Sequence, residues 1–378
     1  MAKYRFDQIA INSTAKKKPV EEDRFTYLGL EHLDSGSLKV TRYGSEVAPI
    51  GEKLIMRKGD VLFGKRRAYQ KKVAIAPFDG IFSAHGMVLR PKEDVIDKEF
   101  FPLFISSDYF LDAAIKISVG SLSPTINWRD LKALEFELPD LETQRRLAAV
   151  LWSMNATMDS YKELIAATDE LVKSQFIEMF GTPESVMESS HTIAEVADVQ
   201  VGIVIKPTRY YSDGNNGIKA FRSLNIGPMY IKDDDWVYFT EKAMEETQRT
   251  VAHTDDILVV RSGNPGTSCV VPPEYNGCNV IDLMIVRPNK KKVLPKYLSA
   301  FTNMPHGMNQ INSQQRGVAQ KHFNVGMFKD LRLILPPLDI QKQFVDFLEQ
   351  SDKSKFELEQ ALLELTAAYK RIISENLG

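Results

Sequence analysis

Apolar residues recur at alternating steps of four and three along a segment that opens with Leu138-Pro-Asp-Leu-Glu-Thr-Gln and runs to Phe180. The stripe consists of Leu147, Leu151, Met154, Met158, Tyr161, Ile165, Thr168, Val172, Gln175 and Met179, with Thr168 and Gln175 as two polar interruptions. Such spacing is typical of a coiled-coil seam. It predicts a helix of some forty residues, about 60 Å long at 1.5 Å per residue. Asp140 is suited to cap its first turn, and Gly181-Thr-Pro183 to end it.

The same segment occurs a second time, from Leu335 to Leu377, at an offset of 197 residues. Its stripe consists of Phe344, Leu348, Ser351, Lys355, Leu358, Leu362, Leu365, Tyr369 and Ile372. Of the twenty-five positions from Gly120 to Gln144, eight are identical at this offset. The pairs are Gly120/Gly317, Asn127/Asn324, Lys132/Lys329, Leu134/Leu331, Leu138/Leu335, Pro139/Pro336, Leu141/Leu338 and Gln144/Gln341. The chain is therefore a two-fold repeat.

A single apolar stripe of this length needs a partner, because an isolated helix leaves it in water. The nearest partner is the other long helix, and the order globule, helix, globule, helix allows the two to pair antiparallel. The alternative is that each helix folds back on its own globule, in which case helices of three to four turns are expected.

The segments that precede the helices have short apolar runs broken by turn residues, which predicts strands. Examples are Phe25 to Leu30, Asp60 to Gly64 and Val73 to Pro77, and the apolar spacing of residues 97–116 predicts one or two helices. We therefore expect an α+β fold with two mixed globules and two long helices, related by a pseudo-two-fold repeat. The expected boundaries are residues 1–139 and 182–336 for the globules, and 140–181 and 337–378 for the helices.

Composition indicates a globular cytoplasmic protein, since no apolar run reaches the length of a membrane span and the first residues lack a signal-peptide core. Two cysteines, Cys269 and Cys278, are too few for a zinc site and are expected to be reduced thiols. The formal net charge is −2, but residues 1–72 hold sixteen basic against nine acidic side chains. This imbalance leaves room for a basic binding face.

Motifs of enzymes are absent from the sequence. It contains neither phosphate-binding glycine loops, nor His-Glu-x-x-His, nor a Gly-x-Ser-x-Gly elbow, nor an Asn/Asp-Pro-Pro-aromatic methyltransferase signature. Asp255-Asp256 and Asp233 to Asp235 are better explained as turns than as metal ligands. We expect neither catalysis nor a metal site on this chain.

Basic residues instead predict a binding site for nucleic acid. In the first globule the candidates are Arg57, Lys65, Arg66, Arg67, Tyr69, Lys71 and Lys72. Lys16 to Lys18 form a further lysine-rich segment. In the second they are Lys206, Arg209, Arg222, Arg261, Ser262 and Asn264. Lysine and arginine neutralise phosphates, and arginine and asparagine suit guanine and adenine edges. A lysine-rich solvated surface is the alternative for either cluster alone.

Two stretches carry a family resemblance: Gly120-Ser-Leu-Ser-Pro-Thr-Ile-Asn-Trp-Arg-Asp-Leu-Lys and the following Leu138-Pro-Asp-Leu-Glu-Thr-Gln, both repeated from Gly317. With them, the chain resembles the specificity (S) subunits of Type I restriction-modification enzymes. The resemblance covers the whole chain. It implies that each globule is a target recognition domain that recognises one half of a split, asymmetric double-stranded DNA sequence, and that the helices set the spacing.

The resemblance also implies partners and cofactors. Two modification subunits that hold S-adenosylmethionine would dock on the helices, and restriction subunits would add ATP- and Mg-dependent translocation and cleavage. The alternative is a coiled-coil scaffold whose globules bind protein rather than DNA.

Overall fold

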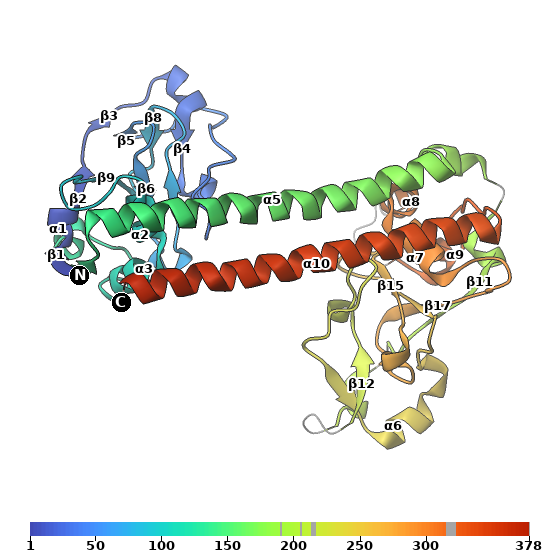
Figure 1. Ribbon diagram of the computed structural model, residues 1–378. Coiled ribbons are helices and arrows are strands. Elements are labelled where there is room, and N and C mark those ends of the chain that lie inside the picture. The colour runs from blue at the N-terminus through green and yellow to red at the C-terminus, as the bar shows by residue number, and fades with distance from the viewer. Residues whose placement is uncertain (190, 205, 213–216, 315–322, 378) are drawn as a thin grey trace. The chain divides into compact units, whose positions relative to one another are not determined.

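The computed structural model describes residues 1–189, 191–204, 206–212, 217–314 and 323–377 (Figure 1). Two compact units divide the chain: one contains Met1–Glu163 and Glu359–Gly378, and the other contains Leu164–Leu358. Helix α5 spans Leu141–Phe180 and helix α10 spans Leu338–Leu377, so each contributes to both units. Both predicted helices of 40 residues are confirmed, and their ends obey the offset of 197 residues.

The first unit is built on short strands, which pair antiparallel except for the parallel pair β4–β8. Its strands are β1 (Ala2–Arg5), β2 (Ala10–Ser13), β3 (Lys16–Lys17), β4 (Tyr27–Leu28), β5 (Lys53–Met56), β6 (Val61–Phe63), β7 (Val73–Ile75), β8 (Gly80–Phe82), β9 (Met87–Pro91) and β10 (Glu135–Leu138). Its helices, besides α5 and α10, are α1 (Phe6–Ile9), α2 (Phe100–Ser106), α3 (Asp108–Lys116) and α4 (Trp128–Leu131). One sheet has the order β2-β9-β6-β7, a second has β3-β5-β8-β4, and β1 pairs with β10.

Most of the predicted elements of this unit are confirmed. Strands β6 and β7 occupy two of the predicted apolar runs, and the 97–116 segment forms two helices separated by Ser107, whose hydroxyl accepts the Phe110 amide. The strand predicted from Phe25 to Leu30 is shorter in the structure. Only Tyr27 and Leu28 are extended, because the preceding acidic residues form a 3₁₀ helix in which Asp23 accepts the Val20 amide.

The second unit repeats this topology. Its strands are β11 (Ala197–Val201), β12 (Ile218–Phe221), β13 (Val237–Phe239), β14 (Ile257–Val260), β15 (Ser268–Val270), β16 (Asn279–Val280) and β17 (Leu283–Pro288). Its helices are α6 (Glu241–Glu246), α7 (Pro295–Asn303), α8 (Pro305–Gln314) and α9 (Val325–Lys329). The sheet order β11-β17-β14-β15 matches β2-β9-β6-β7, and the parallel pair β12–β16 matches β4–β8. The predicted repeat is confirmed, although Gly317 lies outside the described residues.

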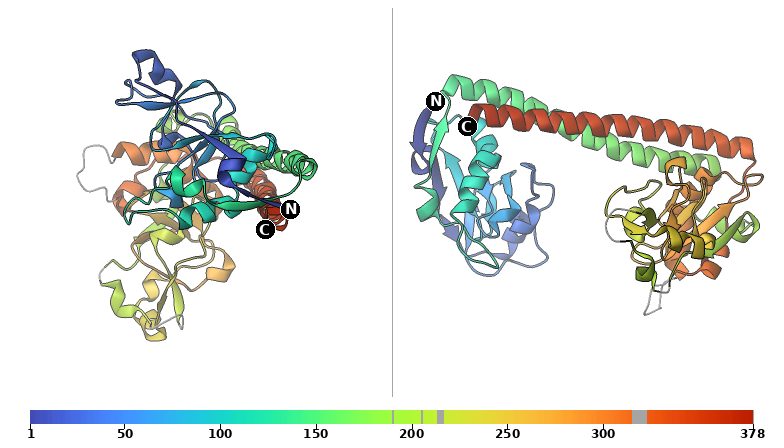
Figure 2. Two further views of the ribbon diagram at one scale, coloured as in Figure 1. Left: turned by 90° about the vertical axis from the view of Figure 1, so that its left-hand side faces the viewer. Right: turned by 90° about the horizontal axis from the view of Figure 1, so that it is seen from below.

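Within each unit, α5 and α10 run side by side and antiparallel (Figures 1 and 2). In the first unit Asn155 donates to the Tyr369 hydroxyl at 3.4 Å, and Thr366 donates to the Met158 sulfur at 3.5 Å. In the second, Lys355 pairs with Asp169 at 2.7 Å. The two residue numbers add up to 524 in all three pairs, so one register holds in both units.

Every residue of the two predicted stripes is buried or half-buried, which confirms the antiparallel coiled coil. The alternative, in which each helix folds back on its own globule, is wrong. The helices also serve the cores of the globules: Leu151 and Leu377 join a phenylalanine-rich core in the first unit, and Phe176 and Phe344 join the core of the second. Burying one such side chain contributes roughly 1.5–3 kcal/mol.

Two buried glutamines fix the start of each long helix in the same way. The Gln144 amide oxygen accepts the Asp97 amide at 2.8 Å, while its NH₂ group donates to the carbonyls of Val95 (3.1 Å) and Pro139 (2.8 Å). Its repeat partner Gln341 makes the equivalent bonds to Leu294, Lys292 and Pro336 at 2.8, 3.0 and 2.8 Å. The equivalent hydrogen bonds thus explain why glutamine occurs at this position in both copies of the repeat.

Candidate nucleic-acid interface

A loop between β6 and β7, residues 64–72, carries most of the predicted basic residues of the first unit; we call it the basic loop. Its base is closed by the Gly64 amide, which donates to the Lys72 carbonyl at 2.9 Å. Ala68–Gln70 form a single 3₁₀ turn, in which Ala68 is buried whereas Tyr69 is 57% exposed. Burial of the small residue anchors the turn and leaves its aromatic neighbour available to a ligand.

Arg66 and Arg67 are both exposed on this loop. The Arg66 guanidinium donates to the Ser123 hydroxyl at 3.0 Å, and its other side lies 3.4 Å from the His85 ring. Neither contact is with a carboxylate, so the positive charge of Arg66 is not neutralised by them. Arg67 adds a second cation next to it.

Around Lys65 and His85 the charged neighbours that shift the pKa are cations. Partial burial lowers the pKa of Lys65, and the nearby charge of Lys16 lowers it further. Burial also lowers the pKa of His85, an effect to which Arg66 and Lys65 add. Mutual repulsion of this kind is relieved when an anion binds between the cations.

Other candidates in the first unit have partners of their own. Lys71 contacts both Asp108 and Asp112 at 2.7 Å, and these hydrogen bonds raise its pKa. Lys72 donates to the Leu30 carbonyl at 2.6 Å. Arg57 is exposed but precedes β6, so it lies at the opposite end of that strand from the basic loop.

The equivalent loop of the second unit follows β14 and carries Arg261, Ser262 and Asn264. The Arg261 carbonyl accepts the Phe323 amide at 3.1 Å, just as the Lys65 carbonyl accepts the Ile126 amide at 2.9 Å. Unlike Lys65, however, Arg261 forms an ion pair with Asp282 at 2.7 Å. Asn264 is exposed on this loop, and Ser262 is half-buried.

Three further candidates of this unit lie on other segments. Lys206 and Arg209 are exposed at a 3₁₀ turn, where the Arg209 guanidinium stacks 4.4 Å from the centre of the Tyr210 ring. Arg222 follows β12 and pairs with Asp235 at 3.2 Å. Among the predicted candidates, all of which lie in described ranges, the second unit therefore offers fewer cations without an acidic partner than the first.

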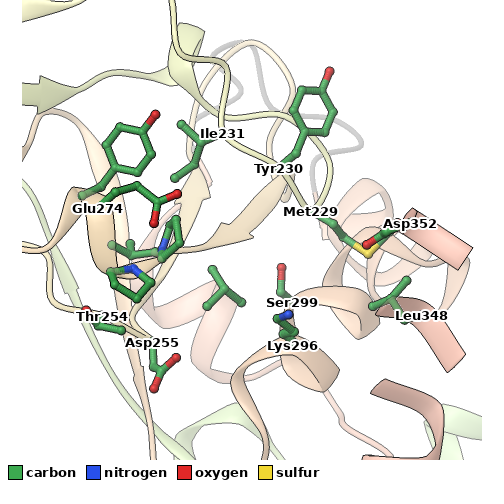
Figure 3. A pocket seen from close by; sticks show the side chains of 15 residues that line it. Met229, Tyr230, Ile231, Thr254, Asp255, Glu274, Lys296, Ser299, Leu348 and Asp352 are labelled. Carbon is green, nitrogen blue, oxygen red and sulfur yellow. The ribbon is translucent and has the colours of Figure 1, made fainter. Parts of the chain in front are cut away.

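A pocket of about 540 Å³ lies in the second unit, away from these candidates in the sequence. Leu348 and Asp352 reach it from α10, Lys296 and Ser299 come from α7, and loops supply Thr254, Asp255 and Glu274 (Figure 3). Lys296 is paired with Glu349 at 2.6 Å. The pocket is thus acidic on balance and unsuited to phosphate.

Candidates for other chemistry have structural roles. Cys269 and Cys278 are free and buried, and burial raises their thiol pKa values to about 12 and about 11. Asp256 pairs with Arg287 at 3.4 Å, and Asp233 with Lys219 at 2.6 Å. Over the described ranges, no group of three or more potential ligands is placed to hold a metal ion. None of the helices in these ranges is long and apolar enough to cross a membrane.

The sequence model of the family described as the Type I restriction modification DNA specificity domain matches residues 15–167 and again residues 193–366. The chain belongs to this family. Its two specificity domains coincide with the two halves of the repeat, so the family match and the topology define the same duplication.

The chain is similar to curated specificity subunits of Type I restriction enzymes. The Type I restriction enzyme StySPI specificity subunit of Salmonella potsdam is 22% identical over 362 residues, which cover 89% of this chain and 76% of that protein. The EcoKI specificity subunit of Escherichia coli K12 is 22% identical over 296 residues, covering 72% and 62%.

Solved structures have the same fold at low identity. The S subunit of a Type I restriction-modification system from M. genitalium aligns over 100% of this chain and 96% of its own, with a TM-score of 0.56 and 12% identity. A chain from a structure that describes complex assembly and conformational transition of the type I R-M system covers 99% and 97%, with a TM-score of 0.58 and 18% identity.

Two residues of the first specificity domain near Arg66 were not predicted from the sequence. Ser123 is 57 positions and His85 is 19 positions away from Arg66 along the chain, and neither belongs to a cluster of basic residues in the sequence. Ser123 lies within the repeated stretch that begins at Gly120, and its place in that stretch was the only sequence signal for its importance.

Proposed function

We propose that this chain is the non-catalytic DNA-recognition subunit of a Type I restriction-modification complex. Each specificity domain recognises one half of a bipartite, asymmetric target, and the two long helices set the distance between the halves. The observation that carries the proposal is the duplication of the specificity domain together with the uncompensated cations of the basic loop.

The basic loop supplies both kinds of contact that specific DNA binding requires. Lys65, Arg66 and Arg67 are placed to neutralise phosphates, and a guanidinium of Arg66 or Arg67 also has spare donors for the edge of guanine in the major groove. Tyr69 adds an exposed ring that stacks or accepts hydrogen bonds. In the second domain Lys206, Arg209 and Asn264 are the exposed candidates, while Arg222 and Arg261 first have to exchange an acidic partner for DNA.

The long helices are the proposed docking site for two modification subunits. Leu164, Leu171, Phe356 and Leu363 are between 51% and 63% exposed on them, which is costly for apolar side chains in water. In this proposal the partners bind S-adenosylmethionine, ATP and Mg, restriction subunits join the same assembly, and the complex acts in the cytoplasm on double-stranded DNA.

A binding experiment tests the proposal. The chain is purified with its modification subunit, and its affinity for genomic DNA fragments is measured as a function of salt. We expect sequence-dependent binding with a steep salt dependence, because each neutralised phosphate releases about 0.9 counterion. A complex that binds DNA no better than the modification subunit alone would favour a coiled-coil scaffold whose globules bind protein.

A further inference from the structure

The segment 119–125 of the first unit is a closed hairpin, which we call the tip hairpin. The amide of Val119 donates to the Thr125 carbonyl at 3.0 Å, and the Thr125 amide donates back at 2.9 Å. Gly120 has φ +115°, a conformation that favours glycine, and the Thr125 hydroxyl bonds the Ser123 carbonyl at 3.0 Å. These constraints fix the conformation of the tip before any ligand binds.

An apolar side chain stands at the end of this hairpin. Leu122 is 94% exposed and Val119 is 65% exposed. Water penalises such exposure, so a fixed hairpin that presents leucine indicates a surface that is covered when a ligand binds. No catalytic or metal-binding group adjoins the leucine in the hairpin itself, which has the sequence Val-Gly-Ser-Leu-Ser-Pro-Thr.

The tip hairpin is attached to the basic loop. Arg66 donates to the Ser123 hydroxyl at 3.0 Å and also forms a backbone bridge with Thr125, while the Ala68 amide donates to the Pro124 carbonyl at 3.3 Å. Leucine and arginine are therefore presented together. A purely apolar protein partner would gain nothing from the cations, whereas DNA offers phosphates for them and stacked bases for the leucine.

We propose that Leu122 inserts between two neighbouring base pairs of the half-site bound by the first specificity domain. This inference rests on the proposed DNA-recognition function and adds a specific residue to it. Arg66 and Arg67 hold the flanking phosphates while the leucine partly unstacks one step. Apolar wedges of this kind kink a duplex by about 20–90°.

The wedge also contributes to sequence selectivity. Unstacking is least costly at flexible pyrimidine–purine steps, so the first half-site should contain such a step where Leu122 enters. Selectivity at this position then comes from the deformability of DNA rather than from a hydrogen bond to a base.

Base-analogue fluorescence on the assembled complex tests the proposal. The methylated target is first mapped. Duplexes of this target then carry 2-aminopurine or pyrrolocytosine at one position at a time, so that their fluorescence reports unstacking of that base. The distance between the two ends of the duplex is measured by energy transfer and reports bending. We expect bright fluorescence at one step of one half-site and a shortened end-to-end distance. In Leu122→Ala both signals should be lost, and the affinity should fall about tenfold, the value of one buried leucine.

Ile50→Ala is the matched control, because it removes another branched aliphatic side chain that is also 94% exposed in the same unit and lies outside the tip hairpin and the basic loop. It should keep both signals. Undiminished fluorescence and bending in Leu122→Ala would overturn the wedge while leaving DNA recognition intact. Loss of modification-subunit binding in Leu122→Ala would also overturn it, because the tip would then be a protein contact. Failure of the wild-type complex to bind DNA would instead refute the proposed function.

Discussion

At the scale of single residues, the basic loop contains both cations with an acidic partner and cations without one. Arg66 and Arg67 have no acidic partner among the contacts seen over the described ranges, whereas Lys71 is held by Asp108 and Asp112. Although all three were equal candidates in the sequence, their surroundings in the fold distinguish them.

The double variant Arg66→Ala, Arg67→Ala should weaken specific DNA binding by about 1–3 kcal/mol for each base edge that the two arginines bind. The salt slope should fall by about one for each phosphate that they neutralise. Titration of the assembled complex with labelled target at several salt concentrations measures both. Lys71→Ala is the control of equal charge type and should change the affinity little. A loss in Lys71→Ala of about half that of the double variant would show that the loop acts only through its net charge.

The buried glutamines give a second residue-scale prediction. Gln144→Ala removes partners from one amide and two carbonyls, and each buried group left unsatisfied costs about 1–3 kcal/mol. We expect a clearly lower thermal midpoint, and a similar decrease for Gln341→Ala. Glu163→Ala, an exposed change on the same helix, should stay within about 0.5 kcal/mol. Unchanged midpoints in both glutamine variants would contradict the anchoring role.

Sequence alone predicted the residue types of the candidate site but not their pairing. Arg66 meets Ser123, and Arg261 meets Asp282, through contacts that depend on how distant loops pack. Local pattern contains no information about such contacts. The tip hairpin was likewise visible only as part of a repeated stretch, because a single leucine between serines has no periodicity.

At the scale of elements, the long helices were the most predictable part. Forty residues of regular heptad spacing without a proline or glycine, the Asp140 cap and the terminating Gly181 all have local causes, and all are confirmed. The Asp140 carboxylate accepts the Thr143 amide at 2.8 Å, and Gly181 has φ +82°. Short strands were harder, since two or three residues carry too little pattern. The sequence did not predict the register in which α5 and α10 pair; the contact between Asn155 and Tyr369 defines it.

This register defines a deletion that tests the spacing role of the helices. Removing residues 160–166 from α5 and 358–364 from α10 takes out one heptad from each helix and preserves the register, because the residue numbers of contacting pairs add up to 524. Each helix shortens by about 10 Å at 1.5 Å per residue. With base pairs about 3.4 Å apart, the gap in the methylated motif should shrink by about three base pairs.

Methylome sequencing of a strain that carries this deletion measures the gap. Both halves of the motif should keep their bases, because the specificity domains are unchanged. An altered half, or an unaltered gap in an active complex, would contradict the spacing role. Removal of the heptad from α5 alone is the control and should abolish methylation, since the two stripes then fall out of register.

At the scale of the whole molecule, duplication gives one chain two specificity domains, which is what the proposed asymmetric target requires. The two units share their sheet order, their glutamine anchors and their helix pairing, yet their loops after β6 and β14 differ in charge. A common scaffold with different loops is the arrangement expected of two recognition modules with different base preferences. The family match to both halves agrees with this division.

The most direct test of DNA recognition by this chain compares the methylated sequences of two strains that differ only in the chain, with its modification subunit present in both. We expect one bipartite, asymmetric methylated motif in the strain that contains the chain and its disappearance in the other. The same methylated motifs in both strains would contradict a role of this chain in choosing the target.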